Sequence, residues 1–273
     1  MKKVILFIIL ITFFMSLQLQ GFAVERDKKN NILDQPLQVA IIIDDFGGDV
    51  KGVNEFFASK IPITVAIMPF LTNSSEQAQK AHELGLEVML HLPLEPKKGK
   101  KSWLGPNPIT SDLSEEEIRK RLTTAIESIP HVAGINNHMG SKIVEDEKIM
   151  RVILEVVKEY DLYVIDSGTS GKSVIPKLAE NMNIPWSTRD IFLDDTHSSN
   201  SHVYKQMLKL AKVANKRGKA IGIGHVGIKG HETVKGVQSA LSHFKELGIQ
   251  IVPASHLLET KIEQNPERFW QSD

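Results

Sequence analysis

The sequence predicts an α/β fold, a single-domain distorted (β/α) barrel with seven or eight parallel strands, and three observations lead to it. Short apolar runs alternate with helical patterns along the chain, which is the order of elements in repeated βα units. Most of these runs are continuously apolar, as expected for parallel strands covered on both faces. No change in composition marks a border between two domains. An open doubly wound sheet would show the same alternation, and we favour the barrel.

The predicted strands and helices follow one another regularly. The helix after Ser114 begins with a capping box, Ser114-x-x-Glu117, and runs to about Ser128. Glycines that tolerate a positive φ follow several helices directly before a strand, at positions 85, 218 and 248. Helical apolar spacing covers residues 145–160, 200–217 and 231–247. The apolar runs that predict strands are residues 39–43, 62–68, 86–92, 132–137, 162–166, 190–194, 220–225 and 249–254.

The composition limits the classes of function. The chain has 273 residues, of which 41% are hydrophobic and 24% charged, as in an ordinary globular protein. Its 33 basic and 33 acidic residues leave no basic excess for a nucleic-acid groove, so we expect no nucleic-acid partner. The absence of cysteine excludes disulfides, thiolate metal sites and cysteine nucleophiles. Any metal ion must therefore be held by histidines and carboxylates.

The first residues resemble an export signal. Two lysines precede an apolar run from Val4 to Leu17, which is the length of a signal-peptide core and short for a membrane span. Gly21 and Ala23 then form a small-residue cleavage pattern. We predict a signal peptide over residues 1–23 and a linker over residues 24–37. The protein is expected to be exported, either secreted or associated with the cell envelope; a retained N-terminal membrane anchor is the alternative.

Ionisable residues stand at the C-terminal ends of the predicted strands. These ends meet on one rim of a barrel, and burying so many charged groups there by chance would be costly. Two histidines and one aspartate would form a metal site with positions left for water. Each residue also has a simpler interpretation: a turn at Asp44-Asp45, a hydrogen-bonded core histidine at His91, or a helix cap at Asp166. The residues are Asp44, Asp45, His91, His138, Asp166, Asp194 and His225, with His256 just past the last strand.

Two further segments carry open interpretations. The loop at residues 93–113 contains four prolines and four lysines and follows the third strand, on the face where barrel active sites lie. Its Trp103 could stack on a sugar ring or pack within a lid. Gly222-x-Gly224-x-x-Gly227 matches a dinucleotide fingerprint, but it lies on the penultimate strand and no acid ends the next one. We therefore expect no nucleotide cofactor. The glycines are expected to let the backbone approach a packed or occupied site closely.

Six motifs in order resemble the divergent polysaccharide deacetylase family, a branch of the NodB-like carbohydrate esterases. The resemblance covers residues 38–258, which leaves residues 259–273 as a C-terminal tail. It implies a distorted (β/α) barrel with a divalent metal, expected to be zinc, and an N-acetylated glycan as substrate. The motifs are VAIIIDDFG, LHLPLEP, GINNHMGS, VIDSGTS, RDIFLDD and IGIGH.

The resemblance also implies roles for single residues. Asp44 would be the general base, Asp45 a metal ligand and His225 the general acid. The family's H-x-x-x-H motif is missing, so His91 and His138 are the expected histidine ligands. Substrate-orienting or supporting roles would fall to Asp166, Arg189, Asp190 and Asp194.

The expected function is therefore metal-dependent removal of N-acetyl groups from a polysaccharide or cell-wall glycan. The alternative is a catalytically inactive cell-envelope protein that binds a metal or a glycan. The retention of both Asp44 and Asp45 favours catalysis, because binding alone needs no base.

Overall fold

A computed structural model describes residues 36–259 of the chain. The predicted signal peptide, most of the predicted linker and all but one residue of the predicted tail lie outside this range. Within the described part, no helix is long and apolar enough to cross a membrane.

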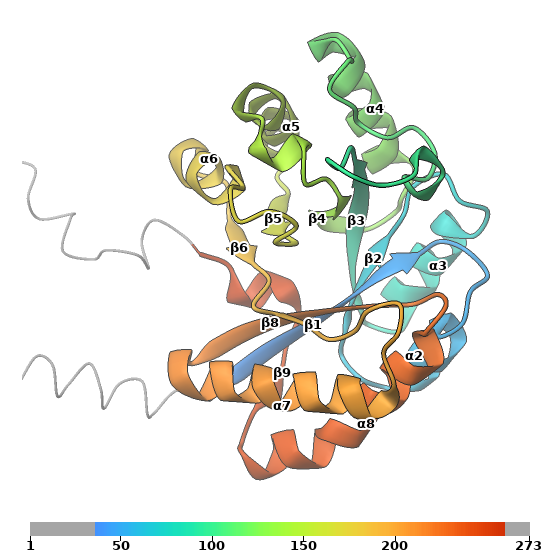
Figure 1. Ribbon diagram of the computed structural model, residues 1–273, viewed down its shortest axis with the longest axis vertical. Coiled ribbons are helices and arrows are strands. Elements are labelled where there is room, and N and C mark those ends of the chain that lie inside the picture. Colours follow the sequence, from blue (N-terminus) through green and yellow to red (C-terminus); the bar gives the residue numbers. More distant parts are fainter. Residues whose placement is uncertain (1–35, 260–273) are drawn as a thin grey trace, which may run out of the picture. The chain divides into compact units, whose positions relative to one another are not determined.

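A curled parallel sheet forms an open barrel (Figure 1). Eight of its nine strands follow one another in a single series, and the ninth, β9 (Gln250–Ile251), pairs with β1. The two outermost strands are β6 and β7, between which no pairing is recorded among the described residues. In spatial order the strands are β6 (Trp186–Thr188), β5 (Tyr163–Asp166), β4 (Val132–Met139), β3 (Glu87–Leu94), β2 (Thr64–Ile67), β1 (Gln38–Phe46), β8 (Lys219–His225) and β7 (Ile191–Phe192). The predicted α/β class and parallel barrel are confirmed.

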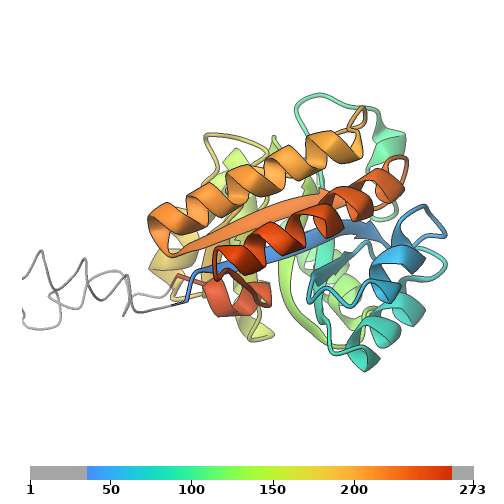
Figure 2. The same cartoon turned by 90° about the horizontal axis from the view of Figure 1, so that it is seen from below.

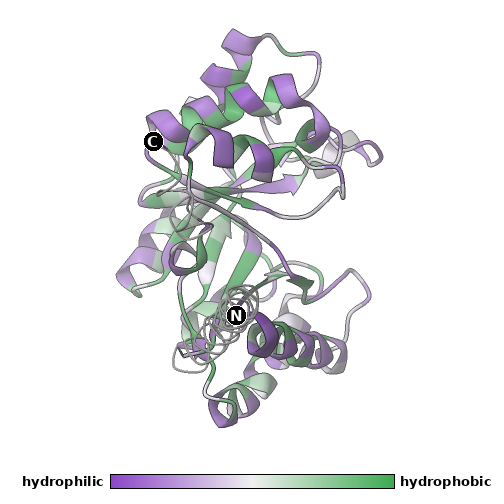
Figure 3. Cartoon of the chain, turned by 90° about the vertical axis from the view of Figure 1, so that its left-hand side faces the viewer, coloured by the Kyte–Doolittle hydropathy of each residue, from purple (hydrophilic) through white to green (hydrophobic). Residues whose placement is uncertain are grey.

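Helices cover the outside of the sheet, and α7 and α8 lie side by side over the β1–β8 region (Figure 2). Their apolar residues face the strands while hydrophilic residues face outward (Figure 3). The helices are α2 (Val53–Ala58), α3 (Ser74–Glu83), α4 (Glu115–Glu127), α5 (Glu147–Glu159), α6 (Ile175–Met182), α7 (Asn200–Arg217) and α8 (Gly230–Glu246).

Local sequence explains where several helices begin and end. The Ser114 hydroxyl accepts a hydrogen bond from the Glu117 amide at 3.2 Å, so α4 begins where the capping pattern predicts. Gly218 ends α7 with a φ of 82°, a left-handed conformation that a side chain would disfavour. Gly85 and Gly248 also have positive φ, as predicted.

The last predicted strand is confirmed but is much shorter than predicted. Residues 249–254 contribute only the two-residue strand β9 (Gln250–Ile251), which pairs with the first residues of β1. Pro253 ends this ladder because it has no amide hydrogen to donate. The following turn, η3 (Ala254–Leu257), donates to Thr64 and Glu87 at the starts of β2 and β3. His256 therefore lies at the N-terminal end of the barrel, opposite the rim.

Strand β6 was not predicted. Its three residues, Trp186–Thr188, are too short and too polar to form an apolar run. It forms one end of the strand series, where it pairs with β5.

The inward-facing positions of the barrel strands continue from the apolar core to polar residues at the rim. Ile42, Met89 and Ile223 belong to the buried apolar cluster inside the barrel. Side chains along a strand alternate between its two faces, so inward positions recur every second residue. Two residues further on, towards the rim, these three strands carry Asp44, His91 and His225.

Candidate metal centre and active site

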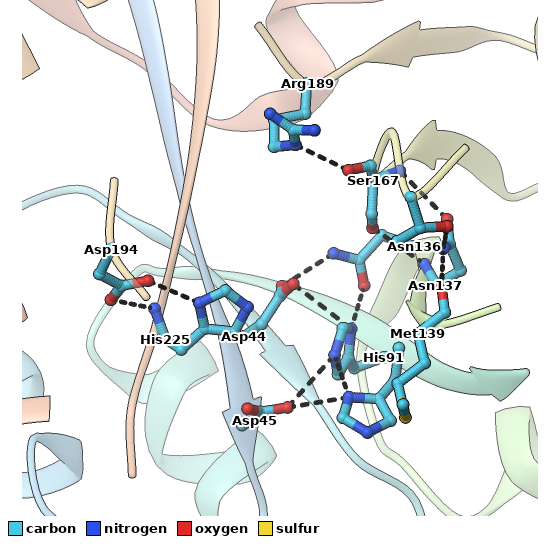
Figure 4. Close-up of polar contacts among 12 residues, drawn as sticks. Asp44, Asp45, His91, Asn136, Asn137, Met139, Ser167, Arg189, Asp194 and His225 are labelled. Carbon is cyan, nitrogen blue, oxygen red and sulfur yellow. Dashed lines mark hydrogen bonds and ion pairs between the residues drawn. The ribbon is translucent and has the colours of Figure 1, made fainter. Parts of the chain in front are cut away.

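Three ligand atoms from three strand ends converge on one point. The Asp45 Oδ1 lies 3.3 Å from His91 Nε2 (Figure 4). It lies 3.1 Å from His138 Nδ1. The two imidazole nitrogens are 3.1 Å apart. Among the described residues this is the group of three that could hold a metal ion. The two histidines come from neighbouring strands β3 and β4, in place of the missing H-x-x-x-H motif.

The outer nitrogens of both rings face carbonyl oxygens. His91 Nδ1 lies 2.7 Å from the Asn136 Oδ1, and His138 Nε2 lies 2.9 Å from the Trp103 carbonyl oxygen. A carbonyl oxygen can only accept, so each outer nitrogen carries the hydrogen and donates it. The inner nitrogens therefore present lone pairs towards Asp45.

This arrangement fits a cation. Asp45 Oδ1 is buried and has no hydrogen-bond partner within the described range, although two ring nitrogens lie beside it. Three acceptors that face one another are satisfied by a metal ion. Ligands about 2.0–2.1 Å from a tetrahedral zinc lie roughly 3.3–3.4 Å apart, close to the separations here. The residues present thus fit zinc with a fourth position left open.

The electrostatics agree with Asp45 as an anionic ligand. Burial opposes its ionisation, but the neighbouring His138 and His91 outweigh burial and hold the pKa of its carboxyl well below the ordinary value.

A bulge in β1 directs Asp45. The β1–β2 register shifts between Ile43 and Phe46, and Asp45 has a φ of 70°. Aspartate is among the few side chains that visit this left-handed region. The extra residue separates Asp45 from the regular alternation, so its carboxylate and that of Asp44 reach the same imidazole from different sides.

Asp44 occupies a buried position beside the metal centre. Its Oδ1 accepts a hydrogen bond of 2.8 Å from Asn136 Nδ2, and its Oδ2 lies 3.7 Å from His91 Nδ1. Burial raises the pKa of the Asp44 carboxyl, although the charges of His91 and His225 oppose the shift. Asp44 is thus a carboxylate with strengthened basicity.

Asn136 is a site residue that the sequence analysis missed. Its amide bridges Asp44 and His91, with one group donating and the other accepting. One signal pointed to it: Asn136 precedes His138 by two residues in β4, which places both side chains on one face of the strand.

His225 and Asp194 form a second polar unit. His225 Nδ1 donates to Asp194 Oδ1 at 2.7 Å, and the His225 amide donates to Oδ2 at 2.9 Å. The Thr233 hydroxyl also donates to Oδ2, at 2.5 Å, and nothing in the sequence pattern indicated this contact. Burial favours the neutral ring, but the bond to Asp194 and the charge of Asp44 outweigh it and raise the pKa of His225 to about 9.

Asp166 and Arg189 support the neighbouring loop. Asp166 Oδ1 accepts from the Gly168 amide at 2.8 Å, which is a turn-forming bond. Arg189 donates to the carbonyls of Ser167 and Gly168 at 2.7 and 3.0 Å, and its guanidinium carbon lies 3.5 Å from the centre of the Phe192 ring. Burial lowers the pKa of Arg189, against the opposing charges of Asp166, Asp190 and Asp44.

Asp190 is not brought to the site, which corrects its predicted role beside the substrate. Its carboxylate forms an ion pair with Arg217 and accepts from the Ile221 amide at 2.8 Å. Ile221 precedes His225 by four residues, or about 13 Å along an extended strand. The carboxylate therefore joins β8 to the end of α7.

The glycines that match a dinucleotide fingerprint allow helices to pack closely on β8, as expected. A Cβ at Gly222 would lie 2.7 Å from Leu210 of α7, and one at Gly224 would lie 3.1 Å from Thr233 of α8. Both glycines allow the helices to approach β8 closely.

A cleft of about 460 Å³ opens beside the two polar units. Asp45 of the metal centre lines this cleft, as do His225 and Asp194. The exposed aliphatic side chains of Val50 and Ile228 also line it. A bound molecule in this cleft can contact the metal centre and His225 together.

A sequence-family model for divergent polysaccharide deacetylases matches residues 41–258. The chain belongs to the divergent polysaccharide deacetylase family. Two relatives are uncharacterised proteins: YibQ of Escherichia coli, 32% identical over 221 residues, and a Haemophilus influenzae protein, 31% identical over 232 residues. The matches cover 81% and 85% of this chain and 67% and 80% of the relatives.

Solved structures share the fold of this family member. An uncharacterised protein from Agrobacterium tumefaciens superposes with a TM-score of 0.75 at 21% identity, covering 82% of this chain and 89% of that one. The Bc1960 peptidoglycan N-acetylglucosamine deacetylase superposes with a TM-score of 0.56 at 13% identity, covering 83% and 90%. This member of the divergent polysaccharide deacetylase family therefore has the parallel-stranded barrel fold of NodB-like proteins.

Proposed function

We propose that this protein is an exported, metal-dependent hydrolase that removes N-acetyl groups from a polysaccharide or cell-wall glycan. One observation carries the proposal: Asp45, His91 and His138 present three unprotonated acceptor atoms within 3.3 Å of one another, at a cleft that His225 also lines. Zinc is the metal that this nitrogen and oxygen donor set favours. The predicted signal peptide is the basis for export.

The proposed reaction divides its proton transfers between two residues. When bound, the metal would polarise the acetamide carbonyl and acidify the attacking water. Asp44 takes the proton of that water, and His225 donates a proton to the nitrogen that leaves with the sugar. Asp194 keeps the hydrogen of His225 on Nδ1, so Nε2 is the nitrogen available to the substrate.

The pKa shifts of Asp44 and His225 support their roles as base and acid. Burial raises the pKa of Asp44 and so makes the carboxylate a stronger base, although the charges of His91 and His225 oppose it. The bond to Asp194 and the charge of Asp44 raise the pKa of His225 to about 9 against the effect of burial, so the ring holds a proton at neutral pH. A base and an acid with opposite protonation states are what amide hydrolysis requires.

The family and the predicted export support the proposed substrate class. The family indicates a polysaccharide substrate, and the protein of the same fold whose structure was compared above is a peptidoglycan N-acetylglucosamine deacetylase. The indole of Trp103 is 58% exposed, so it is available to a sugar ring and is not packed within a lid. We therefore favour stacking for this residue.

Acetate release tests the function. We expect the zinc-loaded protein to release acetate from peptidoglycan fragments or chitin oligosaccharides, and to lose this activity when a chelator removes the metal. Asp44→Asn should reduce turnover by about 10²–10⁴-fold while zinc stays bound. Full turnover in zinc-loaded Asp44→Asn would contradict the assignment. Bound zinc and glycan without acetate release from any of these substrates would instead support the catalytically inactive alternative.

A further inference from the structure

The two histidines of the metal centre are held in different ways. The outer nitrogen of His91 bonds to Asn136, which lies inside the sheet on β4 and is fully buried. The outer nitrogen of His138 bonds to the backbone carbonyl of Trp103, which lies on the long loop between β3 and α4. One ligand therefore has a partner in the barrel, and the other depends on a surface loop.

This loop is anchored next to the carbonyl. We call residues 97–104 the Trp103 loop; it contains the single turn η1 (Lys101–Trp103). Leu104 is 4% exposed, so its side chain packs inside the protein, whereas Trp103 is 58% exposed and has the Lys100 amino group 5.6 Å from its ring centre. Leu104, and not the indole, therefore fixes the position of the Trp103 carbonyl.

The loop carbonyl determines which nitrogen of His138 is free. Donation from Nε2 to this oxygen leaves the lone pair on Nδ1, which faces Asp45 and His91. Without the carbonyl, the ring could carry its hydrogen on either nitrogen and could rotate. Removing such a partner from a metal-binding histidine typically weakens metal affinity by about 10–100-fold.

We propose that the Trp103 loop is a positioning element of the metal centre, and that docking of the loop and binding of zinc stabilise each other. The proposal rests on the metal centre of the proposed function. Coupling between two binding events is reciprocal, so zinc must favour the docked loop by the factor by which the docked loop favours zinc.

Trypsin provides a direct test, because Lys98 and Lys100 are cleavage sites within the Trp103 loop. We expect zinc to slow cleavage after these lysines by about 10–100-fold in the full-length protein, since cleavage follows the population of the undocked loop. Lys60 is exposed and precedes β2 at the opposite end of the barrel, so its cleavage rate should not change. It also controls for any effect of zinc on trypsin.

Two neighbouring variants separate the carbonyl from the side chain. Leu104→Asp should undock the loop and weaken zinc binding by about 10–100-fold, measured by competition with a chromophoric chelator. Trp103→Ala removes the indole but keeps the carbonyl, so its zinc affinity should stay within about twofold of the wild type. Circular dichroism verifies that both variants are folded.

The outcomes distinguish this inference from the proposed function. If the wild type binds zinc and the loop is cleaved equally fast with and without it, the coupling is wrong and the metal centre stands. Equal zinc affinity in folded Leu104→Asp would also overturn the coupling. If the wild type binds no zinc, the metal centre and the coupling are both wrong. Loop protection by zinc together with weakened binding in Leu104→Asp supports both.

Discussion

Asp44 and Asp45 are adjacent in the chain, yet their carboxylates face opposite nitrogens of the same His91 ring. Asp44 Oδ2 lies 3.7 Å from Nδ1, and Asp45 Oδ1 lies 3.3 Å from Nε2. The left-handed backbone at Asp45, with a φ of 70°, produces this separation. One carboxylate can therefore bind a metal while its neighbour remains free to accept a proton.

Asn136 should control metal affinity, because its amide directs both Asp44 and His91. We expect Asn136→Ala to weaken zinc binding by about 10–100-fold, measured by chelator competition. Asn137→Ala is the matched control, because that side-chain amide instead accepts from the Ser167 N–H and donates to the Met139 carbonyl and the Thr169 hydroxyl. An equal loss in both variants would indicate general loosening of β4 and would contradict a specific role for Asn136.

The pKa of His225, about 9, predicts the pH limit of activity. Turnover should fall above about pH 9, where the proposed general acid loses its proton. His225 also affects stability: its folded pKa exceeds the ordinary 6.5, so its contribution is complete below pH 6.5 and is lost as pH rises through about 9.

Asp194→Asn should lower the pKa of His225, because it removes the charge that accepts from Nδ1. The alkaline limit of turnover should then move to lower pH. Titration of the His225 ring by NMR measures this directly. An unchanged pKa of the His225 ring in the variant would show that Asp194 does not raise this pKa.

Asp190 should affect stability and not activity. Asp190→Ala leaves the buried Ile221 amide without its acceptor, which should cost about 1–3 kcal/mol in unfolding free energy. Its other partner, Arg217, is largely exposed, so Arg217→Ala should cost no more than about 1 kcal/mol. Chemical denaturation measures both values. Loss of acetate release in folded, zinc-loaded Asp190→Ala would return this residue to the active site.

Close packing of α7 against α8 should make Gly236 sensitive to substitution. A Cβ at this position would lie 2.4 Å from Val203 Cβ and 2.8 Å from the Asn200 carbonyl oxygen. Alanine gains about 1 kcal/mol in helix propensity, but overpacking costs about 1–3 kcal/mol, so we expect net destabilisation. Ser239→Ala on the exposed face of α8 should change stability by less than about 0.5 kcal/mol. A stabilised Gly236→Ala would refute the packing argument.

Much of the barrel could be predicted because strand patterns are local. Parallel strands buried on both faces read as apolar runs, and all eight predicted runs contribute strands to the sheet, the last of them only the two residues of β9. The shortened last strand and the unpredicted strand β6 have a common origin. The run at 249–254 is apolar but is stopped by Pro253, and β6 is a strand with almost no apolar pattern. Both depend on pairing with distant strands, which a local pattern does not contain.

The sequence by itself determined the α/β class, the order of the elements and the placement of Asp44, Asp45, His91, His138 and His225 at strand ends. Only the tertiary structure decided how these side chains meet. The bulge that turns Asp45, the amide of Asn136, the hydroxyl of Thr233 and the carbonyl of Trp103 all act across long sequence separations. The physical reason is that periodicity arises within one element, whereas ligand geometry depends on register and contacts between elements.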